Sequence, residues 1–131
     1  MPNGYLTDGD MRQIVENGNM QVVVTKAKEA AQHMTKDKDK VTSSQLRNIF
    51  GTIKKIQLKV NSGRNVNFQK ELFLLIPKLY YASKRANGKL DKLRDDIEGM
   101  VKLIGNDTNK FNNFYNYIEA VLAYHKAFEK K

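Results

Sequence analysis

The 131-residue chain contains no cysteine and no tryptophan, and only two prolines and two histidines. The lack of cysteine excludes disulfides, thiolate metal ligands and cysteine nucleophiles. No apolar run approaches the roughly 20 residues that span a bilayer, and residues 1–10 contain no apolar stretch typical of a signal peptide. We therefore expect a cytoplasmic protein without a membrane partner.

Catalytic motifs are also missing from the sequence. It contains neither a Walker phosphate-binding loop nor a GxGxxG motif. Neither His33 nor His125 belongs to a pattern that predicts a catalytic triad or a metal site within one helix. His125 falls on an apolar stripe, which favours a histidine in the core or at an interface over a catalytic base. We expect no enzyme and no cofactor.

One acidic group could be interpreted as a metal site. Four acids lie close together in the sequence: Asp91, Asp95, Asp96 and Glu98. Lys92 and Arg94 interleave them, and acids in the early turns of a helix are explained by their favourable interaction with the helix dipole. We expect no metal there. A metal-dependent nuclease built on these acids is the enzymatic alternative.

The positive charge of the chain is concentrated in one segment. Residues 40–89 contain eleven Lys and Arg and a single acid, Glu71, whereas the remaining residues contain twelve basic and thirteen acidic side chains. The net charge of +9 therefore comes entirely from the middle of the chain. Such segregation favours a polyanionic partner, with nucleic acid as the leading candidate.

Apolar residues recur at intervals of three and four along most of the sequence, and no segment alternates with period two for long enough to predict a sheet. The length and the 40% of hydrophobic residues suit one domain with its own core. We predict an all-α fold, a compact single-domain bundle of about five helices. Residues 1–19 are expected to be an N-terminal segment with a short helix over residues 10–17, and residues 20–131 the bundle.

The clearest helix start lies at residue 42. Thr42 as N-cap and Gln45 three residues later form the pattern of a capping box, and Val41 can pack on Leu46 as a hydrophobic staple. The apolar stripe that follows ends at residues 61–63. Comparable stripes predict helices over residues 20–34, 68–86, 90–104 and 108–131. Pro77 should kink the helix over residues 68–86, because it cannot donate a backbone hydrogen bond.

Basic residues share faces on two of these helices. Arg47 and Lys54 are seven residues apart and therefore lie on one face, where Gly51 would allow a close backbone approach. Lys78 and Arg85 repeat this spacing on the next helix, with Tyr81 between them. Cations interleaved with an aromatic ring suit single-stranded nucleic acid, although a core position for Tyr81 is slightly favoured. The candidate RNA-binding residues are Arg47, Lys54, Arg64, Lys78, Lys84 and Arg85.

Three segments of the chain match short motifs of a known family. They are residues 41–50 (VTSSQLRNIF), 76–85 (IPKLYYASKR) and 114–126 (FYNYIEAVLAYHK). In this order and at this spacing they resemble the small subunit of the type III-A CRISPR effector (Csm) complex. The resemblance covers about residues 20–130.

The resemblance implies a helical bundle that takes part in antiviral defence and catalyses no reaction. Several copies would associate with one another beside the backbone and large subunits of the Csm complex, along the path of the guide RNA and the target RNA. Arg47, Lys78 and Arg85 match recurrent basic positions of the family, whereas Lys54 and Arg64 rest on the spacing and charge of this sequence. Three residues match the terminal motif and imply packing or subunit contacts: Glu119, Tyr124 and His125.

We therefore predict that residues 20–131 form an RNA-binding domain that holds target RNA without reading its sequence. The main alternative is a protein–protein adaptor in the same complex that makes no direct RNA contact. An amphipathic protein of a membrane surface is disfavoured, since the apolar stripes are needed for the core.

Overall fold

The computed structural model describes residues 4–36, 40–62 and 67–129, and the regular structure in these ranges is entirely helical. The helices are α1 (Asp8–Val15), α2 (Met20–Met34), α3 (Ser43–Asn61), α4 (Phe68–Arg85), α5 (Asp91–Ile104) and α6 (Thr108–Phe128). The all-α prediction is thus confirmed. The described part of the chain has six helices rather than about five, because the N-terminal segment contains a complete short helix. None of these helices is long and apolar enough to cross a membrane.

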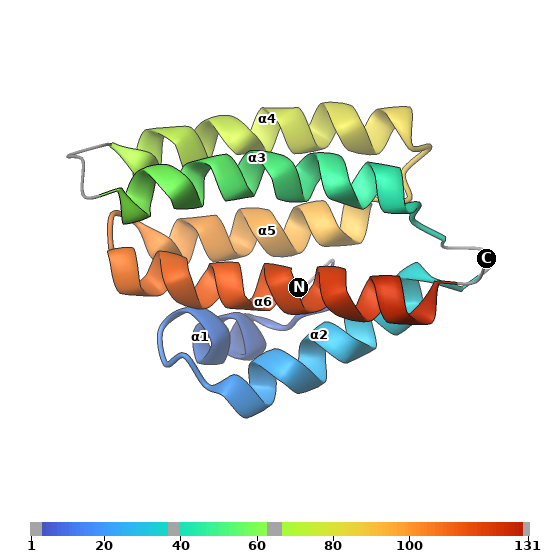
Figure 1. Cartoon of the computed structure of the whole chain (residues 1–131), viewed down its shortest axis with the longest axis horizontal. Helices are drawn as coiled ribbons and strands as arrows, with labels where there is room; N and C mark the ends of the chain where they lie inside the picture. The colour runs from blue at the N-terminus through green and yellow to red at the C-terminus, as the bar shows by residue number, and fades with distance from the viewer. Residues whose placement is uncertain (1–3, 37–39, 63–66, 130–131) are drawn as a thin grey trace.

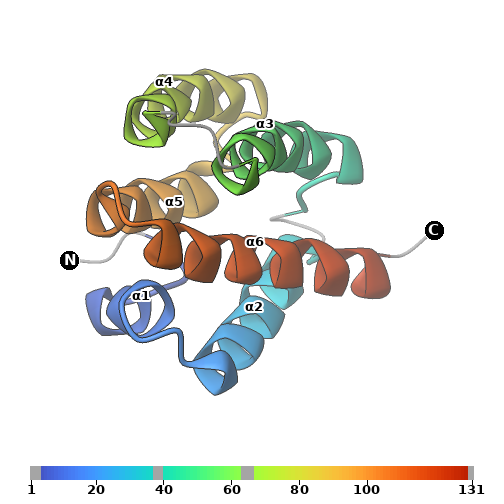
Figure 2. The ribbon, with the colours of Figure 1, turned by 60° about the vertical axis from the view of Figure 1, so that its left-hand side comes forward.

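The helices are arranged in three layers of two (Figures 1 and 2). α3 and α4 form one outer layer, α5 and α6 the middle layer, and α1 and α2 the other outer layer. α6 contacts α1, α2, α3 and α5, while α5 contacts α1, α4 and α6. The middle helices are therefore covered on two sides, and α3 and α4 leave one side of their pair facing solvent.

Capping residues determine where the helices begin. At α3 the Thr42 hydroxyl accepts from the backbone N–H of Gln45 (3.1 Å), and the Gln45 side chain accepts from the N–H of Thr42 (3.0 Å), which confirms the predicted capping box. Thr7 and Asp10 form a second capping box that the sequence analysis missed. Because Thr7 is the N-cap, α1 begins at Asp8 and not at Asp10.

The turn between α4 and α5 is formed around Asn87 and Gly88. Both residues have positive φ, 56° and 81°. The N–H of Gly88 donates to the carbonyl of Ser83 (2.9 Å), and the N–H of Asn87 donates to the carbonyl of Lys84 (3.1 Å). This is the hydrogen-bond pattern of a Schellman C-cap, in which the left-handed position is taken by asparagine. α4 also continues through Pro77 in its interior.

α6 forms the centre of the core. Tyr117 lies on this helix and is fully buried. The reason is the third layer: α1 and α2 cover a side of α6 that a two-layer bundle would leave exposed. Among the described residues the Tyr117 hydroxyl has no hydrogen-bond partner. Burial, reinforced by the nearby Asp96 carboxylate, raises the pKa of Tyr117 well above its ordinary value.

The N-terminal residues are attached to the middle layer by Asp96. This carboxylate is fully buried on α5 and accepts the backbone N–H groups of Tyr5 (3.0 Å) and Leu6 (3.2 Å). A Cβ at residue 4 would overlap the carboxylate and lie 2.6 Å from the carbonyl oxygen of Lys92, so this close approach requires Gly4. Burial raises the pKa of Asp96 to about 7, although the two N–H donors oppose the shift.

His125 is a core histidine, as the sequence predicted. It is buried, and its Nε2 lies 2.7 Å from the carbonyl oxygen of Val41. Because a carbonyl only accepts, Nε2 carries the proton in this contact. The bond joins α6 to the residue before the N-cap of α3, and so links two segments that are 84 residues apart.

Candidate nucleic-acid interface

The predicted RNA-binding residues that the structure describes are all exposed: Arg47, Lys54, Lys78, Lys84 and Arg85. Arg64 lies outside the described residues. Exposure alone does not make a site, so we next asked which of these side chains share a surface, and which other residues lie beside them.

An open groove of about 340 Å³ lies between α3 and α4. Three lysines line it: Lys55 and Lys59 from α3, and Lys78 from α4. The two α3 lysines are four residues apart, so their side chains lie one above the other on the side of α3 that faces α4. The remaining lining residues are Thr52, Ile56, Leu58, Glu71 and Leu74.

Glu71 is the acid in this groove. Its carboxylate lies 2.7 Å from the Nζ of Lys59, in an ion pair that joins α3 to α4. Both side chains are partly exposed, so the pair adds at most about 1 kcal/mol of stability and can be exchanged for another anion. Among the described residues no ion pair is found for Lys55 or Lys78.

A second hollow of about 190 Å³ continues along the same pair of helices toward the turn between α4 and α5. Arg85 lies there beside Gln45 and Asn48 of α3. The guanidinium of Arg85 is 5.8 Å from the centre of the Tyr81 ring. Tyr81 is 66% exposed, so the favoured core position for this residue is wrong, and its ring is accessible to a stacking partner.

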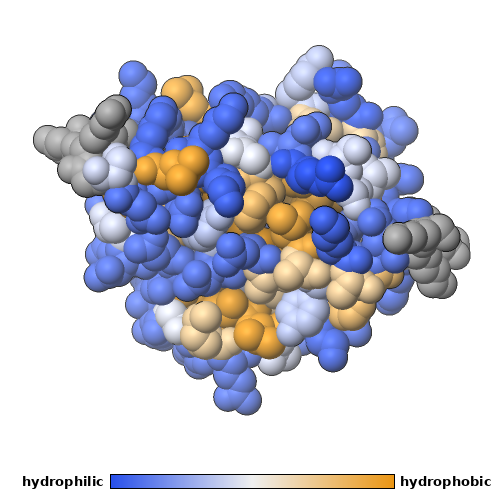
Figure 3. Space-filling view, viewed as in Figure 1, coloured by the Kyte–Doolittle hydropathy of each residue, from blue (hydrophilic) through white to orange (hydrophobic). Residues whose placement is uncertain are grey.

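Arg47 and Lys54 do not lie in this groove. Successive residues of a helix are about 100° apart, so Lys54 is a quarter turn away from Lys55. Both residues lie on the side of α3 that carries Phe50, whose ring packs on Tyr115 of α6. Apolar side chains are visible along the seam between α3 and α6, with hydrophilic surface around them (Figure 3). The two predicted basic faces are thus separate surfaces.

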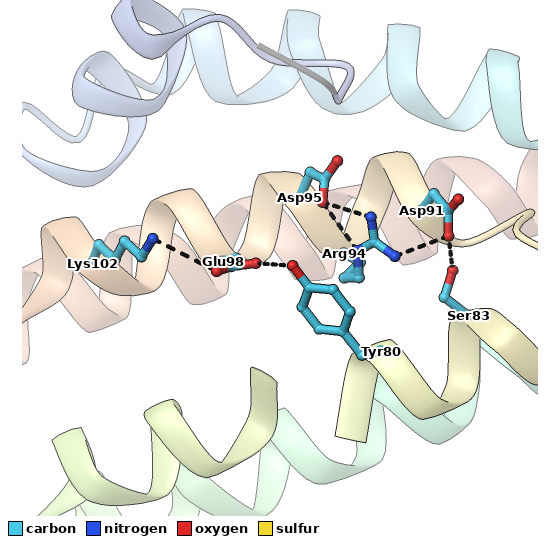
Figure 4. Close-up of polar contacts among 7 residues, drawn as sticks. All are labelled: Tyr80, Ser83, Asp91, Arg94, Asp95, Glu98 and Lys102. Carbon is cyan, nitrogen blue, oxygen red and sulfur yellow. Dashed lines mark hydrogen bonds and ion pairs between the residues drawn. The ribbon is translucent and has the colours of Figure 1, made fainter. Parts of the chain in front are cut away.

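The acidic residues of α5 are engaged in contacts with neighbouring side chains (Figure 4). Arg94 pairs with Asp91 (3.1 Å) and Asp95 (3.0 Å), and its guanidinium lies 4.3 Å from the centre of the Tyr80 ring. The Tyr80 hydroxyl donates to Glu98 (2.8 Å), which raises the pKa of Tyr80. Within the described residues no group of three or more His, Cys, Asp or Glu side chains could hold a metal ion.

Comparison with known families agrees with the motifs. A sequence model of the family described as Csm2 Type III-A matches residues 17–131. The chain belongs to the Csm2 family. It is therefore a small subunit of the type III-A CRISPR complex, which places it together with the other subunits of that complex. No curated protein and no solved structure matches the chain.

Residues of the Csm2 terminal motif have different surroundings in the fold. His125 is buried against Val41, and Tyr124 is half-buried with its ring stacked on Phe128 (5.8 Å, 22°). Glu119 is exposed. Two of the three motif residues therefore contribute to packing within the chain. α1 and residues 4–6 precede the part that matches the Csm2 family.

Of the three groove lysines of this Csm2 chain, only Lys78 is among the residues predicted from the sequence to bind RNA. Lys55 and Lys59 are not among those predicted residues. The spacing of four between them was visible, but which side of α3 faces α4 depends on packing. A Cβ at residue 51 would meet nothing within 4 Å, so contacts within the described chain do not require Gly51.

Proposed function

We propose that this small subunit binds RNA in the Csm complex through the groove between α3 and α4, and that it catalyses no reaction. Its ligand is target RNA in the region where it pairs with the guide RNA. Neighbouring copies and the backbone and large subunits would complete the path, in the cytoplasm. Family membership supports the assignment to the complex, whereas the RNA contact rests on the geometry of the groove.

One observation carries this proposal: cations from two helices converge on an open groove that contains a single described acid. Lys55 and Lys78 lie in the groove without an ion-pair partner among the described residues, and Arg85 follows on the same side of α4. Lys78 and Arg85 are seven residues apart, about 10 Å along the helix. This spacing suits a strand that runs along the seam and meets a cation more than once.

The groove suits contacts with the RNA backbone rather than with base edges. Lysine ammonium groups and an arginine bind phosphates of any sequence, and an exposed ring such as Tyr81 can stack on any base. About four phosphate contacts on a single strand predict a log–log salt slope near −3, at about −0.7 per contact. Pairing between guide and target would supply the sequence specificity.

The test compares three variants in binding to unrelated RNA sequences of equal length. K55A/K78A/R85A should weaken binding at least tenfold for every sequence and reduce the salt slope by about 2. R47A/K54A removes cations from the other side of α3 and should have a smaller effect. K28A/K36A/K102A removes three exposed lysines outside the groove and is the control for net charge. Equal affinities of the first and third variants would refute the proposal.

An adaptor without RNA contact is the second candidate, and exposed apolar residues favour it. Leu58, Phe73 and Leu74 on α3 and α4 are 59%, 43% and 53% exposed. Such side chains together with lysines also suit an acidic partner protein. Crosslinking in the assembled complex distinguishes the candidates. RNA crosslinks on α3 and α4 support the proposal, and exclusively protein crosslinks there support the adaptor.

A further inference from the structure

A small basic pocket lies beyond the end of the groove. It has a volume of about 70 Å³ and is lined by Tyr5, His33, Gly88, Lys89 and Lys92. These residues come from the N-terminal segment, α2, the turn between α4 and α5, and α5. Neither the basic faces predicted from the sequence nor the proposed function accounts for this combination.

Aromatic rings and cations are already paired in this pocket. The rings of Tyr5 and His33 are stacked, with centroids 5.7 Å apart and an angle of 22° between their planes. The Nζ of Lys92 lies 5.6 Å from the centre of the Tyr5 ring. Tyr5 is half-buried between these two neighbours, whereas His33, Lys89 and Lys92 are exposed.

The buried Asp96 holds Tyr5 at this position. Its carboxylate accepts the N–H groups of Tyr5 and Leu6, and Gly4 permits the close approach of the chain. Residues 4–6 lie outside the part that matches the Csm2 family. Tyr5 is therefore supplied by a segment that the family match does not include, whereas His33 on α2 lies within the matched part.

The pocket and the second hollow of the groove both lie at the turn between α4 and α5. Arg85, Ala86 and Leu90 line the second hollow of the groove, while Gly88 and Lys89 of the same turn line the pocket. A strand that leaves the groove past Arg85 would therefore meet Lys89 next. The Schellman hydrogen bonds keep this turn in one conformation.

We propose that the pocket formed by Tyr5, His33, Lys89 and Lys92 binds one further nucleotide of the RNA strand held in the groove. Lys89 and Lys92 contact the phosphate, and the base stacks on the exposed His33 ring, which the Tyr5 ring supports from the other side. This inference rests on the proposed function. A volume of about 70 Å³ cannot enclose a free nucleotide, which favours a nucleotide already held by its neighbours in a strand.

The experiment measures the affinity of the full chain for two oligouridines of about 5 and about 12 nucleotides, within the range of strand lengths that small binding domains cover. K89A/K92A and H33A should each weaken binding of the longer oligomer at least fivefold and binding of the shorter one less than twofold. K28A/K102A removes the same charge elsewhere and should leave both affinities within twofold. Circular dichroism checks that all variants are folded.

Three results would overturn the inference. The first is an equal affinity of K89A/K92A and K28A/K102A for the longer oligomer. The second is a loss in K89A/K92A that H33A does not share, because stacking on His33 would then be absent. The third is competition by uridine monophosphate at similar concentration, which would indicate a free nucleotide as the ligand. In each case the loss of affinity in the K55A/K78A/R85A variant tests the proposed function independently of this inference.

Discussion

Asp96 is a fully buried carboxylate without a basic partner among its described hydrogen bonds, and its titration should control how stability depends on pH. Burial raises its pKa to about 7 against an ordinary value of 3.8, and the nearby Asp95 and Asp10 carboxylates add to the shift. The folded protein therefore binds the Asp96 proton more tightly than the unfolded chain does. The perturbation that isolates this effect is Asp96→Asn, because asparagine keeps the shape and an acceptor oxygen but does not titrate.

The sign and size of this pH dependence follow from the linkage between proton binding and folding. Below the unfolded pKa both states are protonated, and the contribution of Asp96 to stability is fully present. As the pH rises toward the folded pKa, the unfolded state releases the proton first, so the free energy of unfolding decreases by about 1.4 kcal/mol per pH unit. Between pH 3.8 and about 7 the loss amounts to about 4 kcal/mol. Above pH 7 both states are ionised, and the contribution stays lost.

Urea denaturation of both proteins at several pH values between 4 and 8 measures the effect. The free energy of unfolding of the Asp96→Asn variant relative to the unmodified chain should increase by about 4 kcal/mol over this range, since all other titrating groups cancel in the difference. Deletion of residues 1–6 should reduce the Asp96-dependent slope, because Tyr5 and Leu6 would no longer cover the carboxylate. A difference that stays constant with pH would refute this account of Asp96.

Three further predictions concern stability and can be checked by the same denaturation. Tyr117→Phe removes a buried hydroxyl that has no partner among the described residues, and should leave stability unchanged or increase it by about 1 kcal/mol; a clear loss would mean that the hydroxyl is hydrogen-bonded. His125→Ala should cost about 3 kcal/mol, because it opens a cavity and leaves the Val41 carbonyl unpaired, whereas the control His33→Ala lies at the surface and should cost under about 0.5 kcal/mol. Thr42→Ala should cost about 1 kcal/mol and Thr42→Ser should restore most of it; equal losses would show that the capping hydroxyl contributes little.

Local features of the fold could be predicted from the sequence because they depend on neighbouring residues. The capping box of Thr42 and Gln45 requires only two side chains that are three positions apart. The burial of His125 followed from its place on a helical stripe. The box at Thr7 has the same kind of pattern, with Asp10 in place of the usual Glu or Gln.

Features that depend on which helices pack against each other could not be predicted from neighbouring residues in the sequence. Tyr117 is buried because α1 and α2 form a third layer against α6, and a helical stripe does not reveal how many neighbours a helix has. Tyr81 is exposed because the side of α4 that it occupies faces away from α5. Predicting that Lys55 and Lys59 face the groove would require knowing how α3 is rotated about its axis. That rotation is defined by packing in the folded chain, such as the contact of Phe50 with Tyr115.

The charge segregation found in the sequence has a structural consequence in the layers. Acids of α5 pair with Arg94, with Tyr80 and with the N-terminal backbone, so they stabilise contacts within and beside the middle layer. The outer layer of α3 and α4 contains Glu71 as its single acid, and this acid lies at one end of the groove. The cations of that layer therefore have few carboxylates to neutralise them within the chain. An anion from outside can supply that charge, as the proposed contact with RNA would.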